Sequence, residues 1–109
     1  MQETIKNITE TEFQQTIAQG CVVVDFSAPW CPDCRFIEPM LDTLAQEFAG
    51  QIQICKISFD DATELKSTLN IRKIPTLICY KDGVEVGERL IEPRSIDSIR
   101  TAFNTLLKG

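Results

Sequence analysis

The stretch Cys21–Cys34, with the sequence CVVVDFSAPWCPDC, decides the fold of this 109-residue chain. It opens with the apolar run Val22–Phe26 and closes with Cys31 and Cys34, which have two residues between them. If the run is a strand and the next segment a helix, Cys31 lies at the helix N-terminus, where backbone N–H groups and the helix dipole favour negative charge. A thiol there loses its proton more easily and becomes a nucleophile. Cys34 lies about one helical turn further on, so the pair can form a reversible disulfide, which predicts a dithiol oxidoreductase.

Length and composition limit the possible classes of protein. A chain of 109 residues suffices for one compact domain, and we expect a single domain over residues 1–109. The net charge of −5, without a basic run, disfavours nucleic-acid binding. No apolar stretch approaches the ~20 residues of a membrane span. The N-terminus lacks the order of a signal peptide and Met1 favours a native start, so we expect a cytoplasmic protein.

Apolar periodicity and capping residues predict alternating strands and helices. The expected strands cover residues 4–8, 22–26, 52–59, 76–80 and 84–91. The expected helices run between Thr9 and Gly20, from about Cys31 to Phe48, in a short segment opened by Asp60, and after the cap Ser95. Pro39 lies inside the second helix and should kink it. This order predicts a mixed sheet with helices on both faces.

With these elements assigned, the chain resembles the thioredoxin family over nearly its whole length. The resemblance rests on motifs in family order, namely Val24–Phe26, Trp30–Cys34, Pro39, Lys56, Ile74–Thr76 and Lys81–Gly83. A two-spaced cysteine pair alone is weak evidence, but together with the upstream aspartate and the downstream Ile-Pro-Thr it is strong. The resemblance implies an α/β thioredoxin fold, with a central mixed five-stranded sheet flanked by four helices.

The resemblance also implies catalytic roles. Cys31 would attack a substrate disulfide, and Cys34 would then resolve the mixed disulfide. Asp25 stands in an apolar strand, where burial should raise the pKa of its carboxyl and suit it to accept the proton of Cys34. In the family the lysine equivalent to Lys56 pairs with this aspartate and tunes it. The alternatives are an aspartate on a solvated strand face and an exposed strand lysine.

A second group of residues would bind the substrate. Trp30 would form a flat apolar wall of the substrate groove, with core packing as the alternative. The resemblance implies a cis peptide bond between Ile74 and Pro75, which would present the backbone of Ile74 and Thr76 to a bound peptide. The alternative is a trans proline at the start of a strand. The partners implied are disulfide-containing proteins and a flavoprotein thioredoxin reductase, and we expect a monomer.

No bound cofactor is expected apart from the redox-active disulfide Cys31–Cys34. Zinc is the alternative for a two-spaced cysteine pair, but zinc needs about four ligands, and the chain has no histidine and no second such pair. The remaining cysteines are Cys21, Cys55 and Cys79, which lie in or beside apolar stretches. We expect them to be inert core thiols, with Cys21 as the best candidate among them for a regulatory role.

Several positions depart from the usual family pattern. Pro32 and Asp33 replace the usual Gly-Pro between the cysteines; proline suits the first helical position, whereas the carboxylate of Asp33 would repel a thiolate on Cys31. The helix dipole partly offsets that repulsion. We therefore expect a protein that reduces substrates and is not a strong oxidant. Ser27 replaces a usual aromatic residue, and Ile91 replaces a groove glycine, which should narrow the range of partners.

Two other classes of function remain open. A non-catalytic thioredoxin-fold binding module is one, although it would need neither the cysteine pair nor Asp25. A glutathione-linked, glutaredoxin-like reductase is the other, with Arg35, Arg72 and Lys73 as basic residues for a glutathione pocket.

Overall fold

The computed structural model of the chain describes residues 5–109. Thr4, where the predicted N-terminal strand begins, lies outside the described residues, and so does Met1. The strands are β1 (Ile5–Ile8), β2 (Cys21–Ser27), β3 (Ile52–Ser58), β4 (Thr76–Lys81), β5 (Val84–Glu85) and β6 (Leu90–Ile91). The helices are α1 (Phe13–Ile17), α2 (Pro32–Glu47), α3 (Thr63–Thr68) and α4 (Ile96–Lys108), with the 3₁₀ turn η1 (Glu10–Glu12) before α1.

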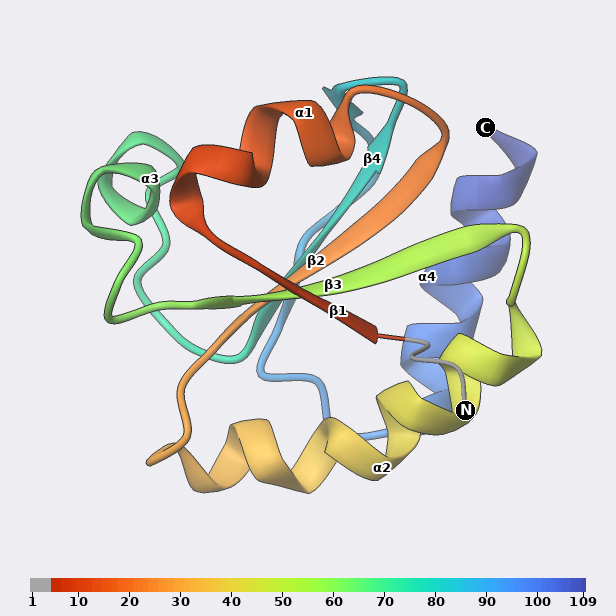
Figure 1. Cartoon of the computed structure of the whole chain (residues 1–109). Coiled ribbons are helices and arrows are strands. Elements are labelled where there is room, and N and C mark those ends of the chain that lie inside the picture. Colours follow the sequence, from red (N-terminus) through yellow and green to blue (C-terminus); the bar gives the residue numbers. More distant parts are fainter. Residues whose placement is uncertain (1–4) are drawn as a thin grey trace.

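The strands form one mixed sheet in the order β1-β3-β2-β4-β5, with β6 also paired to β4 (Figure 1). β1 and β2 both run parallel to β3, whereas β4 runs antiparallel to β2. The predicted α/β architecture is therefore confirmed. In this register Asp25 of β2 lies opposite Lys56 of β3 on one side and Leu77 of β4 on the other.

The last predicted strand, over residues 84–91, is not continuous. It is divided into β5 and β6, and in the register with β4 the residues 86–89 lie opposite only the two residues 78–79. Gly87, inside this bulge, has φ +72°, a left-handed conformation that glycine adopts without steric cost. The bulge explains why the expected fifth strand is present as two short pieces.

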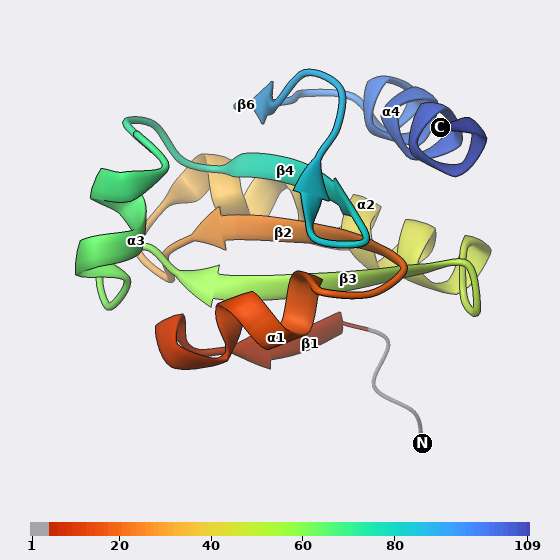
Figure 2. The ribbon, with the colours of Figure 1, turned by 90° about the horizontal axis from the view of Figure 1, so that it is seen from above.

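Helices cover both faces of the sheet. Figures 1 and 2 show α1 and α3 on one face and α2 and α4 on the other. Under α1, the ring of Phe13 packs edge-on against Tyr80, with 5.6 Å between the ring centroids. Between α2 and α4, Phe48 and Phe103 make a similar contact at 5.4 Å. Each face therefore has its own apolar core, and β2 lies between the two.

The alternation of side chains along β2 decides which face of the sheet carries Asp25. Val22, Val24 and Phe26 belong to the core under α1 and α3, and Val23 belongs to the core under α2 and α4. Asp25 shares its parity with Val23 and so lies on the face covered by α2. The fold therefore brings a carboxyl group beneath the helix that the cysteine motif begins.

Helix α2 runs without interruption through Pro39, from Pro32 to Glu47. The kink expected at this proline stays a prediction. Within residues 5–109, no helix combines the length and the apolar character that crossing a membrane requires.

Candidate active site

The two cysteines of the motif lie at the start of α2, as predicted. Cys31 is the N-cap residue, with extended backbone, and Pro32 is the first residue of the helix. The Sγ atom of Cys31 accepts a hydrogen bond from the backbone N–H of Cys34 at 3.1 Å. Both are free thiols in this structure. A sulfur that receives a helical N–H group is well placed to carry negative charge and attack an electrophile.

Both thiols are covered by neighbouring side chains. Cys31 is 4% exposed and Cys34 is 2% exposed, so Cys31 is the more exposed of the two only by a small margin. Ala28 and Ile74 pack against them. Burial, and next the contact with Cys31, raise the pKa of the Cys34 thiol to about 12. Cys34 therefore needs a base before it can act as a nucleophile near neutral pH.

Asp25 is the carboxyl group that can serve as the base for Cys34. Its side chain is 1% exposed, and neither carboxylate oxygen has a hydrogen-bond partner within residues 5–109. Burial raises the pKa of Asp25 to about 7, against an attraction from Lys56 that lowers it. This confirms the expected burial and raised pKa, and the alternative of a solvated strand face is wrong. A carboxyl with this pKa can accept a proton at neutral pH.

Lys56 does not pair directly with Asp25, which corrects the expectation from the resemblance. Its Nζ atom lies 3.0 Å from Oε2 of Glu38, although the sheet register places Lys56 opposite Asp25. Glu38 lies four residues after Cys34 on α2, and therefore on the same side of that helix. Sequence reasoning missed Glu38; this four-residue spacing was the available signal.

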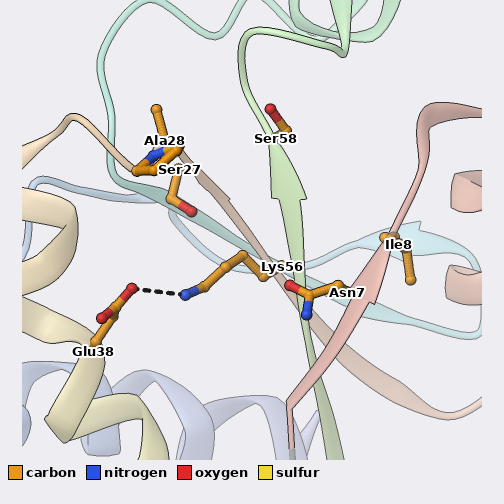
Figure 3. A pocket seen from close by; sticks show the side chains of 8 residues that line it. Asn7, Ile8, Ser27, Ala28, Glu38, Lys56 and Ser58 are labelled. Atoms are coloured by element: carbon orange, nitrogen blue, oxygen red, sulfur yellow. Dashed lines mark hydrogen bonds and ion pairs between the residues drawn. The ribbon is translucent and has the colours of Figure 1, made fainter.

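A pocket of about 300 Å³ surrounds this ion pair. Figure 3 shows the Lys56 side chain extending from β3 to Glu38, with Ser27 on the neighbouring strand. The lining residues come from β1, β2, β3, α2 and the loop after β2, and are Asn7, Ile8, Ser27, Ala28, Pro29, Glu38, Lys56 and Ser58. Ser27 is buried, and its small side chain leaves open space where the family pattern has an aromatic residue.

The loop before β4 faces the cysteines. The peptide bond between Ile74 and Pro75 is cis, which confirms the expectation from the resemblance. The thiol of Cys31 lies 3.8 Å from the carbonyl oxygen of Ile74. Thr76 is buried, and its Oγ1 donates a hydrogen bond to the carbonyl of Lys73 at 2.6 Å. Thr76 therefore has its side chain engaged inside the protein, and its backbone lies between its register partners Phe26 of β2 and Ile91 of β6. The expected role of Thr76 in peptide binding stays a prediction.

Ile91 lies on β6 beside this loop. It is paired with Thr76 across the sheet, and its side chain is 56% exposed. The next residue, Glu92, has φ +52° and donates its backbone N–H to the carbonyl of Pro75 at 2.8 Å. The left-handed conformation thus falls on Glu92 and not on Ile91, and the exposed isoleucine adds apolar surface at the edge of the site.

Trp30 stands beside the cysteines at the surface. Its side chain is 61% exposed, so the alternative of core packing is wrong. The indole Nε1 donates a hydrogen bond to Oδ2 of Asp60 at 2.7 Å. Sequence reasoning missed Asp60 as a partner, because no local signal connects residues thirty positions apart.

Asp33, between the two cysteines, has a partner that the sequence did not indicate. Its Oδ1 lies 3.0 Å from Nη1 of Arg94, in the loop after β6. The guanidinium of Arg94 also lies over the ring of Phe36, 4.3 Å from its centroid. The negative charge of Asp33 near Cys31 is therefore partly balanced, which weakens the repulsion inferred from the sequence.

The remaining cysteines lie away from this site. Burial raises the pKa of Cys55 and of Cys79 to about 11, as expected for inert core thiols. Cys21 is half-buried, and its regulatory role stays a prediction. Within residues 5–109, no cluster of three or more histidine, cysteine or acidic side chains has the arrangement of a metal site.

The fold, with a cysteine pair at the start of α2 and a buried carboxyl beneath it, is that of a class of thiol–disulfide oxidoreductases. Residues 4–105 match the family model Thioredoxin. Thioredoxin from Pseudomonas aeruginosa is 39% identical over 85 residues, which cover 76% of this chain and 79% of that protein. Thioredoxin C-2 from Corynebacterium nephridii is 39% identical over 98 residues, covering 87% and 91%. The chain belongs to the thioredoxin family.

A plant relative matches a shorter part of the chain. Thioredoxin M-type, chloroplastic, from Triticum aestivum is 48% identical over 62 residues, which cover 57% of this chain and 35% of that protein.

Proposed function

We propose that this protein reduces protein disulfides through the dithiol of Cys31 and Cys34. The observation that carries the proposal is the N-cap position of Cys31, whose sulfur accepts the backbone N–H of Cys34 while Asp25 lies buried beneath α2. A nucleophilic sulfur, a resolving thiol and a base with a pKa near 7 are the groups that thiol–disulfide exchange needs.

The reaction proceeds in two exchange steps. The Cys31 thiolate attacks one sulfur of the substrate disulfide, which forms a mixed disulfide and releases the other substrate sulfur as a thiolate that takes a proton from water. Cys34 then gives its proton to Asp25 and attacks the sulfur of Cys31. The Cys31–Cys34 disulfide forms, and the second substrate sulfur leaves as a thiolate that takes a proton from water. Two electrons have then passed to the substrate.

Substrate binding is assigned to the surface around Cys31. The exposed side chains of Trp30 and Ile91 supply apolar contact area. The loop with the cis bond before Pro75 offers the backbone of Ile74 to an extended peptide, whereas Thr76 already has register partners in β2 and β6. Because Ile91 adds a side chain at the groove edge, we expect a narrower range of substrates than in a relative with glycine there.

The proposal extends to the context of the reaction. A flavoprotein thioredoxin reductase would return electrons to the Cys31–Cys34 disulfide, which is the only redox group the mechanism requires. We further propose a single domain over residues 1–109 that acts as a monomer in the cytoplasm, where the reducing environment would maintain the dithiol.

The test is reduction of insulin by the dithiol-charged protein, with each cysteine changed in turn. Cys31→Ser should abolish reduction, because the thiol that attacks the substrate disulfide is removed. Cys34→Ser should leave a stable mixed disulfide with the substrate, seen as a mass adduct that dithiothreitol removes. Cys21→Ser is the matched control, since this cysteine lies outside the site, and should retain activity.

The cysteine variants also separate the other classes of function. If Cys31→Ser loses insulin reduction but keeps full biological activity in cells, a non-catalytic binding module is favoured. Sustained turnover with glutathione as the sole reductant would favour a glutaredoxin-like enzyme. Failure of Cys34→Ser to trap any disulfide substrate would reject the reductase proposal.

A further inference from the structure

Two carboxylates neighbour the ammonium group of Lys56 beneath α2: Glu38 forms an ion pair with it, and Asp25 is the register partner of Lys56 across the sheet. The titratable groups that face Asp25 are Lys56 from β3, and Glu38 and Cys34 from α2. On the β4 side its register partner is the apolar residue Leu77. Among residues 5–109, Lys56 is therefore the cation that can compensate the charge of Asp25, and its position influences how readily that carboxyl ionises.

The ammonium of Lys56 is held by Glu38. The Nζ–Oε2 distance is 3.0 Å, and in Figure 3 the lysine side chain extends toward Glu38. Glu38 has a side chain that is 48% exposed, so pairing there leaves both charges in contact with water. Pairing with Asp25 would draw the ammonium into the dry region under the helix, which costs desolvation energy. The geometry thus favours the outer carboxylate.

The pocket beside Ser27 provides the space for this arrangement. Ser27, Glu38 and Lys56 all line the same opening of about 300 Å³. On β2, Ser27 has the same parity as Asp25, so the opening lies on the face of the sheet that carries the carboxyl group. The small serine side chain leaves the lysine free to reach α2.

We propose that Glu38 is a positioning residue for the reaction, which draws the ammonium of Lys56 to the outer part of the pocket and so leaves the carboxyl of Asp25 unpaired. The effect on catalysis rests on the proposed function: an unpaired carboxyl is the stronger base for the proton of Cys34. The arrangement itself is independent of turnover and can be measured on the resting protein.

Removal of the Glu38 charge favours the carboxylate form of Asp25 in two ways. Lys56 becomes free to approach Asp25, which favours its carboxylate form, and a like charge near Asp25 is lost, which favours that form too. In Glu38→Gln the titration midpoint of Asp25 should therefore fall by about one pH unit. The pH at which resolution of the mixed disulfide reaches half its maximal rate should fall with it.

The measurement is the pH titration of the Asp25 carboxyl carbon by NMR in the oxidised protein, where the paired thiols do not titrate. The matched control is Glu47→Gln, which removes an exposed ion pair with Arg100 from the other end of α2 and should leave the Asp25 midpoint unchanged. In the background of Lys56→Met, the shift caused by Glu38→Gln should shrink to less than half, because most of it acts through the lysine.

An unchanged or higher Asp25 midpoint in Glu38→Gln would overturn the inference, and so would an undiminished shift in the Lys56→Met background. Amide spectra of each variant verify that the fold is retained. If the midpoint shifts as expected while the protein reduces no disulfide, the reductase proposal fails and the positioning by Glu38 stands. If the protein reduces disulfides but the Asp25 midpoint does not move in Glu38→Gln, the reductase proposal stands and the positioning by Glu38 fails.

Discussion

Asp33 and Arg94 come from distant parts of the chain and meet beside the nucleophilic cysteine. Their ion pair measures 3.0 Å, and both side chains remain largely in solvent, so it is weak and sensitive to salt. The stacking of Arg94 on Phe36 limits the freedom of the guanidinium and favours one geometry. Arg94 therefore belongs among the residues that adjust the stability of a thiolate on Cys31.

Arg94→Ala should make the dithiol more reducing. With Asp33 unpaired, its carboxylate disfavours the thiolate, so the reduced form loses stability and the reduction potential falls by about 5 to 20 mV, the worth of an exposed ion pair. Asp33→Asn should raise the potential. Equilibration with glutathione buffers at low salt measures both, and Arg100→Ala on α4 is the control with no expected change.

A fall in potential for Asp33→Asn, or no effect of Arg94→Ala at low ionic strength, would contradict this assignment. The expectation of a reducing protein would itself be wrong if the wild-type potential lay near −120 mV, the range of strong dithiol oxidants.

The divided strand β5–β6 is an element whose position depends on contacts outside the sheet. Arg89, in the bulge, donates from Nη1 to the carbonyl of Leu69 at 2.6 Å, at the end of α3. Its Nε and Nη2 atoms donate to the two carboxylate oxygens of Glu85 in β5. The arginine thus connects the bulge to a helix, and the bulge leads directly into β6 and Ile91 at the edge of the site.

Arg89→Ala should lower the free energy of unfolding by about 1 to 2 kcal/mol, because charge-assisted hydrogen bonds are lost and the Leu69 carbonyl loses its partner. Urea denaturation measures this change. Hydrogen exchange should also become faster at the amide of Val86, which bonds to Cys79 beside the bulge. Arg89→Lys should recover only part of the loss, since an ammonium lacks the planar two-pronged geometry.

Equal stability of Arg89→Ala and the wild type, with unchanged exchange at Val86, would show that the sheet alone holds the bulge in place.

On the scale of the whole molecule, the buried carboxyl has a cost that the two apolar cores must offset. Asp25 is enclosed between the sheet and α2, and burial raises its pKa from 3.8 to about 7. The native state therefore keeps this proton over a pH range in which the unfolded chain releases it. The contribution of Asp25 to the free energy of unfolding is therefore most favourable below the pKa of the unfolded chain. It falls as the pH rises toward the pKa of the folded protein.

The wild-type protein should thus lose roughly 3 kcal/mol of this contribution between pH 4 and pH 7, whereas Asp25→Asn should not. At pH 8 the variant should be more stable than the wild type, and the difference should vanish near pH 4. Urea unfolding of oxidised protein at a series of pH values measures both curves. Parallel curves over this range would contradict a raised pKa for Asp25.

Much of the fold and part of the site followed from local patterns in the sequence. The place of Cys31 at a helix N-terminus and the first helical position of Pro32 were predicted correctly, because helix starts depend on residues within one helical turn. The burial of Asp25 followed from its place in an apolar strand. These inferences needed only neighbours along the chain and the period of a strand or helix.

The sequence by itself determined the element order, the α/β class and the pair of thiols at a helix N-terminus, because each depends on short-range spacing. Only the tertiary structure decided which partners the charged and polar groups of the site have: Glu38 for Lys56, Arg94 for Asp33 and Asp60 for Trp30. It also divided the last strand, through its register with β4. Such pairings join segments far apart in the chain, and their geometry exists only after the sheet and helices have packed.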